Sequence, residues 1–332
     1  MRIALVGAGR IGAFHAEVLA RHADVDTLLI TDADRPRASE LADKLNATFA
    51  PDLAAAVEAG LDAVVIAAAT TAHAGLVHQV ADAGLPIFCE KPIALDLAAT
   101  RSVLAHVQAA GVPLQVGFQR RFDPGHRAAR AVLAEGSLGR VHTLRAVTSD
   151  PEPPRPDYIA HAGGQFRDLH IHDFDAIRFV TGREIDTIYA IGTNIGADFF
   201  AAAGDVDTTA AVLGLDDGSV AVVSGTRYNG AGYDVRLELS GTGGSLVIGL
   251  DERTPLRSAE PDVEWPAGPA YTGFFDRFEA AYQAELAAFL DYARGRIECP
   301  CSGADALAAL QVSEAAERSR AERRPVRLAE LE

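Results

Sequence analysis

The chain has 332 residues, of which 48% are hydrophobic and 23% are charged. That length leaves room for two domains and a large core, and the composition is ordinary for a globular protein. The formal net charge of −16 argues against nucleic acids and anionic membranes as partners, because both are themselves negatively charged.

Targeting signals and disulfides are not expected. No apolar run approaches the ~18 residues that a membrane-spanning helix needs. The 3 cysteines, Cys89, Cys299 and Cys301, do not make a disulfide framework. The first predicted strand begins at residue 2, which leaves no room for a signal peptide. We therefore expect a cytoplasmic protein.

The first motif follows this strand. Residues 2–6 are an apolar run typical of a buried parallel strand, and Gly7, Gly9 and Gly12 follow as a G-x-G-x-x-G turn before a helical pattern. The glycines allow a sharp turn, close approach of a pyrophosphate, and tight packing of helix on strand. The N–H groups of the helix N-terminus then favour phosphate. The pattern predicts a dinucleotide-binding βαβ unit.

Asp32 ends the next apolar run and stands 20 residues after Gly12. A carboxylate at this distance accepts hydrogen bonds from both ribose hydroxyls and repels a 2′-phosphate, so it favours NAD over NADP. Arg35 and Arg37 follow closely. They either hold a 2′-phosphate, so that NADP use stays open, or form a solvated face at the start of a helix.

Strand and helix patterns alternate through roughly the first 120 residues. Glycines end the two predicted helices in this stretch, 72–84 and 97–110. This rhythm predicts an α/β Rossmann domain over residues 1–121, with a doubly wound parallel sheet. The expected elements are strand 63–68, helix 72–84, strand 87–89, helix 97–110 and strand 114–117.

The pattern changes after Arg121 and predicts a second α/β domain over residues 122–332. Charged and aliphatic residues alternate in 234–239, as in an antiparallel strand with one wet face. We expect a large, open, mostly antiparallel sheet with helices on one side, and oligomerisation through its other face. The expected strands are 141–148, 185–193, 207–215, 219–227, 233–240 and 245–249, and the expected helices are 165–181, 274–294 and 303–321, with a surface loop or lid at 150–158.

Three groups of residues suit chemistry. Lys91 directly follows strand 87–89, and ligands of doubly wound sheets bind at the carboxyl ends of strands. Its ammonium suits the stabilisation of a developing oxyanion, although a surface lysine is an equal alternative. Thr70 and His73 follow strand 63–68, where they either contact the cofactor or, in the case of His73, cap the next helix.

Asp168 and His172 stand four residues apart, which places them on one face of a helix. The carboxylate can orient the imidazole, and the imidazole can take a hydroxyl proton as hydride leaves the carbon. His170 points to another face and reads as structural. A metal site is not expected, because His-x-His diverges on a helix and no further cluster completes a ligand set. The alternative to a catalytic role is that this segment, with Asp168 and His172, is simply the polar face of a helix.

Assembled, these residues resemble the glucose–fructose oxidoreductase/inositol dehydrogenase/rhizopine-catabolism (Gfo/Idh/MocA) family over essentially the full length, and within it the inositol 2-dehydrogenases. The segment 158–162 does not match what is expected of an inositol enzyme. The resemblance rests on the glycine turn with Asp32, on Glu90-Lys91-Pro92, on the run from Gly117 to Asp123, on Gly163-Gly164 leading to Asp168, and on His172-Asp173-x-Asp175.

The resemblance implies homotetramers or homodimers built through the second sheet, and a catalytic trio. Lys91 would bind substrate and aid proton transfer, Asp168 would hold substrate hydroxyls, and His172 would be the general acid/base. Arg120 would bind substrate. The residues expected at the cofactor are Gly7, Gly9, Arg10, Ile11, Gly12, Asp32, Thr70, His73, Glu90 and Lys91.

The leading hypothesis is an NAD-dependent oxidoreductase that oxidises a secondary hydroxyl of a cyclic polyol, with myo-inositol to 2-keto-myo-inositol as first choice. A sugar, a glycoside or scyllo-inositol is the alternative substrate. A non-catalytic regulatory protein that senses NAD(P) is a remote alternative, because such a protein does not need Lys91, Asp168 and His172.

Overall fold

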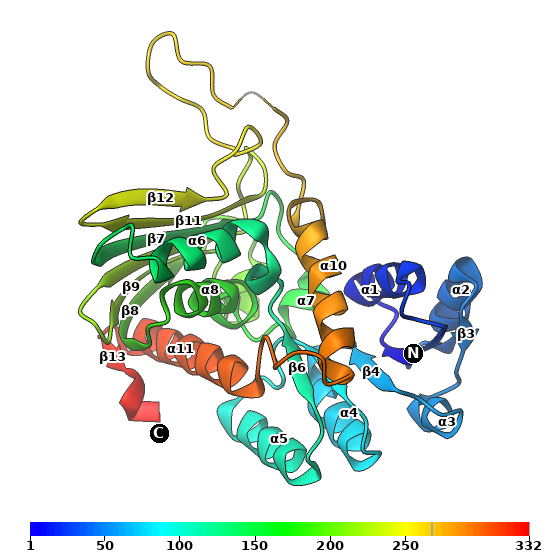
Figure 1. Ribbon diagram of the computed structural model, residues 1–332. Helices are drawn as coiled ribbons and strands as arrows, with labels where there is room; N and C mark the ends of the chain where they lie inside the picture. The colour runs from blue at the N-terminus through cyan, green and yellow to red at the C-terminus, as the bar shows by residue number, and fades with distance from the viewer. Residues whose placement is uncertain (267, 332) are drawn as a thin grey trace. The chain divides into compact units, whose positions relative to one another are not determined.

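A computed structural model describes residues 1–266 and 268–331; residues 267 and 332, which fall in the predicted second domain, lie outside the described residues. The chain divides into two compact units (Figure 1). The first is Met1–Gln119 with Ala280–Leu307, and the second is Arg120–Glu279 with Ala308–Glu332.

The first unit is built on a parallel sheet of six strands in the order β3-β2-β1-β4-β5-β6. β4 and β5 are buried at every residue, as expected for strands covered on both faces. The strands are β1 (Arg2–Val6), β2 (Thr27–Thr31), β3 (Thr48–Phe49), β4 (Ala63–Ile66), β5 (Ile87–Glu90) and β6 (Leu114–Gly117). The predicted Rossmann sheet is confirmed.

The helices of the first unit begin and end where local chemistry allows. The side chains of Asp34, Asp52 and Asp96 accept backbone N–H bonds at three N-termini. Gly111 ends α5 in the left-handed region, with φ of 68°. These helices are α1 (Arg10–Arg21), α2 (Arg35–Leu45), α3 (Leu53–Glu58), α4 (Thr70–Asp82) and α5 (Leu97–Ala110).

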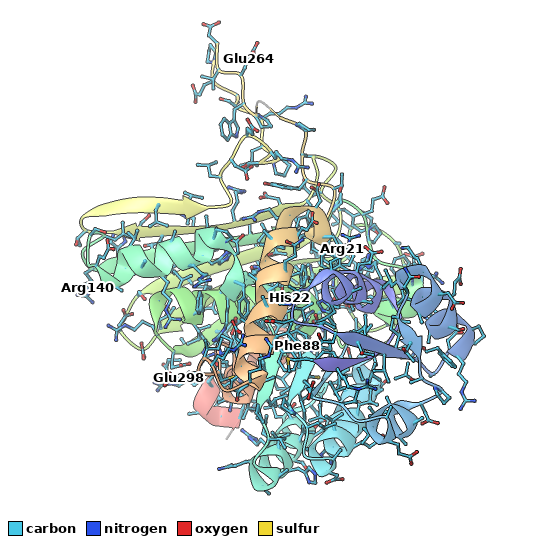
Figure 2. The ribbon with its side chains drawn as sticks, turned by 45° about the vertical axis from the view of Figure 1, so that its right-hand side comes forward. Arg21, His22, Phe88, Arg140, Glu264 and Glu298 are labelled. Atoms are coloured by element: carbon cyan, nitrogen blue, oxygen red, sulfur yellow. The ribbon has the colours of Figure 1, made fainter. Side chains whose placement is uncertain are left out.

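The core of the first unit includes residues from far along the chain. Phe88, labelled in Figure 2, is fully buried on β5, and its ring meets the ring of Phe289 at 5.6 Å between centroids. Leu286 and Leu290 belong to the same buried cluster. The division of the chain therefore differs from the predicted boundaries 1–121 and 122–332, because the apolar face of residues 280–293 packs on the first sheet.

The second unit carries a seven-stranded sheet in the order β12-β11-β7-β10-β9-β8-β13. Neighbouring strands are antiparallel except β7 and β10, which pair in parallel. The strands are β7 (Val141–Ser149), β8 (Ile185–Thr193), β9 (Thr208–Leu215), β10 (Val220–Thr226), β11 (Asp234–Gly241), β12 (Gly244–Ile248) and β13 (Val326–Arg327). The predicted open, mostly antiparallel sheet is confirmed.

Figure 1 shows α6, α8 and the later part of α11 along one face of this sheet, and their apolar side chains share one buried cluster with the strands. Residues 249–266, after β12, extend away from the sheet, with Glu264 labelled among them in Figure 2. The remaining helices are α6 (Pro124–Ala134), α7 (Pro156–Ile159), α8 (Ile171–Thr181), α9 (Phe199–Ala202), α10 (Phe274–Ala293) and α11 (Gly303–Glu322). The part of α10 from Ala280 and the part of α11 up to Leu307 belong to the first unit. Short 3-10 turns lie at Gln119–Phe122 and Leu328–Leu331.

Candidate active site

At two positions of the glycine turn, Gly7 and Gly12, neighbouring backbone atoms leave no room for a side chain. Gly7 has φ of +107°, and a Cβ atom there would lie 2.5 Å from the carbonyl oxygen of Ala67. A Cβ atom on Gly12 would lie 1.8 Å from the carbonyl oxygen of Gly7. Both positions therefore require glycine, the first for its backbone conformation and the second for the close approach of α1 to β1.

Gly9 is different, because a Cβ atom there would meet no atom within 4 Å. Gly9 is the N-cap of α1, and its φ of −71° is open to any residue. The helix start has no side-chain cap and no acidic residue in its first turn. Open space beside uncapped N–H groups fits a pyrophosphate.

Asp32 follows β2 beside this turn. Its Oδ2 accepts the backbone N–H of Ala8 at 2.6 Å, and its Oδ1 accepts that of Asp34 at 2.7 Å. Arg37 places Nη2 at 3.7 Å from Oδ1 of Asp32 and at 2.9 Å from Asp34. The structure thus brings the carboxylate to the glycine turn, as an adenosine ribose requires, with an arginine within reach.

The Lys91 turn lies at the end of β5, two strands from β1. The peptide between Lys91 and Pro92 is cis. Glu90 is buried: its Oε1 lies 2.7 Å from Nε2 of His15 on α1, and its Oε2 accepts the N–H of Lys91 at 3.3 Å. Both carboxylate oxygens therefore make contacts within the first unit, and the cofactor contact of Glu90 stays a prediction.

His73 lies at the start of α4, where Thr70 is the first helical residue. Its Nδ1 lies 2.8 Å from the carbonyl oxygen of Pro92, and its Nε2 lies 3.0 Å from that of Ala68. Burial lowers the pKa of His73, and the two carbonyls oppose this shift. The ring connects the turns after β4 and β5, which does not support the predicted cofactor contact; sequence spacing does not reveal such a link.

In the second unit, Asp168 lies in a π-helical turn. The expected helix 165–181 is in fact a π-helix, Phe166–His170, followed by α8. Such wide turns are rare and often mark functional sites. The Oδ1 of Asp168 accepts the hydroxyl of Tyr158 at 2.7 Å, and its Oδ2 accepts Nη2 of Arg227 at 2.6 Å. Sequence analysis missed Arg227, because its partner is 59 residues away.

His172 follows on the first turn of α8 and is half-buried, like Asp168. His170 is fully buried, with Nδ1 at 2.7 Å from Asp173 and Nε2 at 2.6 Å from Thr209, in agreement with its expected structural role. The second unit thus places Asp168 and His172 on successive turns and turns His170 away from solvent.

Arg120 is also buried. It donates to Asp173 at 2.5 Å and to Thr148 at 2.9 Å. Burial opposes ionisation of Asp173, but the charge of Arg120 and bonds from His170 and Thr148 outweigh it and lower its pKa. The geometry therefore does not support the predicted substrate contact of Arg120, because the guanidinium holds the residue next to His172.

Within residues 1–266 and 268–331, no three His, Cys, Asp or Glu side chains form a group that could hold a metal ion. Over the same ranges, no helix combines the length and the apolar character needed to cross a membrane.

The glycine turn, Asp32 and the six-stranded parallel sheet define an oxidoreductase of the NAD-binding Rossmann class. Residues 1–118 match the description "Oxidoreductase family, NAD-binding Rossmann fold", and residues 126–247 match "GFO/IDH/MocA C-terminal domain". The chain belongs to the Gfo/Idh/MocA oxidoreductase family, and its cofactor is NAD.

Relatives match over nearly the full length. The chain is 42% identical to a myo-inositol dehydrogenase of Streptomyces leeuwenhoekii, covering 96% of this chain and 97% of that one. The crystal structure of a myo-inositol dehydrogenase from Corynebacterium glutamicum superposes with a TM-score of 0.89, at 34% identity over 99% and 98% of the two chains. A scyllo-inositol dehydrogenase from Lactobacillus casei, with bound NAD(H) and scyllo-inositol, gives 0.88 at 29% identity over 99% of each chain.

The two kinds of glycine predict opposite effects of alanine. Gly9→Ala leaves the unfolding temperature of the free protein unchanged, because there is space for the methyl group, but weakens NAD binding at least about tenfold by occupying the pyrophosphate position. Gly12→Ala destabilises the protein by about 1–3 kcal/mol, as overpacking does. Thermal unfolding and NAD titration measure both. Equal destabilisation by the two variants would contradict the assignment of Gly9.

Asp32 predicts the choice of cofactor. Asp32→Ala raises the preference for NADP relative to NAD, measured as the ratio of kcat/KM, by about tenfold or more, because the carboxylate no longer repels the 2′-phosphate and Arg37 is near. Asp34→Ala is the matched control and keeps the NAD preference. If Asp34→Ala shifts the ratio as much as Asp32→Ala, then Arg37 rather than Asp32 sets the choice.

Proposed function

We propose that this protein oxidises one secondary hydroxyl of a cyclic polyol to a ketone, with myo-inositol to 2-keto-myo-inositol as the reaction. The observation that carries the proposal is Asp168 on the π-turn, followed by His172 on the first turn of α8, in a chain with an NAD-binding Rossmann fold. Names of full-length relatives, among them inositol 2-dehydrogenase of Rhizobium meliloti, support the substrate class.

The proposed roles follow from the chemistry of each side chain. Asp168 accepts hydrogen bonds from substrate hydroxyls, His172 takes the hydroxyl proton, and Lys91 stabilises the oxygen as negative charge develops. NAD, when bound, accepts the hydride from the carbon. Lys91 lies in the first unit, and Asp168 and His172 lie in the second.

A second substrate is supported by a specific feature. Tyr158, in the segment that departs from the inositol enzymes, bonds directly to Asp168, so the surroundings of the hydroxyl acceptor are not those expected for myo-inositol. Sugars or glycosides are therefore the alternatives that this feature supports, whereas scyllo-inositol is an alternative because a relative in Bacillus subtilis at 32% identity is named for it. A non-catalytic NAD(P) sensor is the remote alternative.

The test is NADH formation at mildly alkaline pH with myo-, scyllo- and D-chiro-inositol, glucose, levoglucosan and simple glycosides, each with NAD and with NADP. Strong turnover of myo-inositol with NAD supports the proposal. Turnover of a sugar alone keeps the mechanism and changes the substrate. Silence across the panel with intact NAD binding overturns the proposed function.

We further propose a cytoplasmic homotetramer or homodimer, assembled through the outer face of the second sheet. Tyr189, Val212 and Val222 pair in register across β8, β9 and β10, and 41%, 48% and 39% of their surfaces are exposed. Ile191 on β8 is 54% exposed. A row of exposed apolar side chains on an open sheet suits burial against another copy of the chain.

The general-base assignment predicts that His172→Ala lowers kcat at least about a hundredfold, because proton removal is lost, while the dissociation constant for NAD changes little. Steady-state kinetics and NAD titration measure both. His142→Ala, on the exposed surface of β7, is the control and keeps wild-type turnover. Near-normal turnover of His172→Ala would show that another group accepts the proton.

The interface assignment predicts that Val212→Glu lowers the mass in solution, because burying an unpaired carboxylate is unfavourable. Light scattering after size exclusion measures this mass. Ile297→Glu places the same charge at an exposed apolar residue of the first unit and leaves the mass unchanged. A Val212→Glu protein with the wild-type mass would contradict the proposed interface.

A further inference from the structure

Two charged residues outside the proposed catalytic set meet at one edge of the second sheet. Asp150 directly follows β7, and Arg227 directly follows β10. These two strands pair in parallel, so their carboxyl ends emerge at the same edge. Arg227 donates from Nη1 to Oδ2 of Asp150 at 2.6 Å.

The backbone holds this pair rigidly. The N–H of Arg227 donates to the carbonyl of Asp207 at 2.8 Å, and the N–H of Asp150 donates to the carbonyl of Thr226 at 2.9 Å. The Arg227 side chain is only 4% exposed. The planar guanidinium is therefore held in one orientation, which also fixes the position of its second terminal nitrogen, Nη2.

That nitrogen reaches the proposed hydroxyl acceptor. Nη2 of Arg227 lies 2.6 Å from Oδ2 of Asp168. The other oxygen, Oδ1, meets the hydroxyl of Tyr158, a residue that is 48% exposed. One oxygen of Asp168 thus faces the buried arginine, and the other faces an alcohol-like donor on the exposed side.

The local charges explain why a cation is needed. Asp150, Asp168 and Asp205 come from three different segments, and the charges of Asp168 and Arg227 both influence Asp205. Burial raises the pKa of Asp205 despite bonds from two backbone N–H groups. Burial opposes the charge of Arg227 too, but Asp168 and Asp150 outweigh it and raise its pKa. Tyr158, which donates to Asp168, is titratable too, as is His172 on the turn after Asp168.

We propose that Arg227 is a positioning residue, which binds Oδ2 of Asp168 and keeps Oδ1 directed toward the substrate hydroxyl. In the structure the hydroxyl of Tyr158 donates to Oδ1, the same oxygen to which the substrate hydroxyl would donate. The positive charge of Arg227 also stabilises the negative charge of the Asp168 carboxylate, and a carboxylate accepts hydrogen bonds at both of its oxygens. The inference rests on the proposed function, because it deepens the role of Asp168.

The experiment compares pH profiles of kcat/KM for the wild type, Arg227→Met, Arg227→Lys and Tyr158→Phe, with the most active polyol of the panel and saturating NAD. We expect Arg227→Met to lose about tenfold or more of kcat/KM at pH 9, because Asp168 loses the donor that orients it, and to lose more as the pH falls, because the guanidinium no longer stabilises the negative charge of the carboxylate. Arg227→Lys restores the pH dependence but only part of the rate, because ammonium lacks the fork of guanidinium. Tyr158→Phe removes no charge, so we expect its kcat/KM relative to the wild type to be the same at every pH.

Arg178→Met is the matched control, because Arg178 makes a two-point ion pair with Glu184 in the same unit. We expect its profile to follow the wild type. If Arg227→Met does not fold, Arg227→Lys alone decides: a wild-type rate at every pH overturns the inference. An active wild type with an unchanged profile in Arg227→Met also overturns the inference alone, whereas a wild type silent across the panel overturns the proposed function and the inference with it.

Discussion

The cofactor-binding end of this protein depends on one steric constraint, the close approach of α1 to β1. A Cβ atom at Gly12 would lie 1.8 Å from the carbonyl oxygen of Gly7, so the helix sits where only glycine allows it. That position leaves open space at Gly9 beside uncapped N–H groups. It also brings His15 of α1 down to Glu90 at the end of β5, directly before Lys91. Phosphate binding and the lysine turn therefore share one support.

In the second unit, buried ion pairs rather than close backbone packing fix the candidate site. Arg120 binds Asp173, Arg121 binds Asp175, and Arg227 binds Asp168, and all three arginines are buried. Each acidic residue belongs to the π-turn or to α8. Breaking a buried ion pair is costly, so these pairs hold the segment that carries His172 in one orientation. Such support is what the proton transfer proposed for His172 would require.

Much of the fold was predictable from local patterns. The predicted helix 97–110 and the strands 114–117 and 185–193 match the structure to the residue, because apolar periodicity, aspartate caps and terminal glycines act over short distances. The same holds for the glycine turn and Asp32. Where packing between distant segments decides, the structure divides the chain differently from the predicted boundaries: residues 280–307 belong to the first unit, since the apolar side chains of α10 pack on the first sheet.

The sequence by itself determined the nucleotide-binding motif, the alternation of strands and helices in the first unit and the four-residue spacing of Asp168 and His172, because each depends on a short stretch of chain. Only the tertiary structure decided what surrounds them. His73 and Arg120 carry polar groups that suit ligands, yet folding directs them to Pro92 and Asp173. Arg227 reaches Asp168 because β10 pairs in parallel with β7, and strand pairing over such separations is set by burial of the whole sheet rather than by local residue preference.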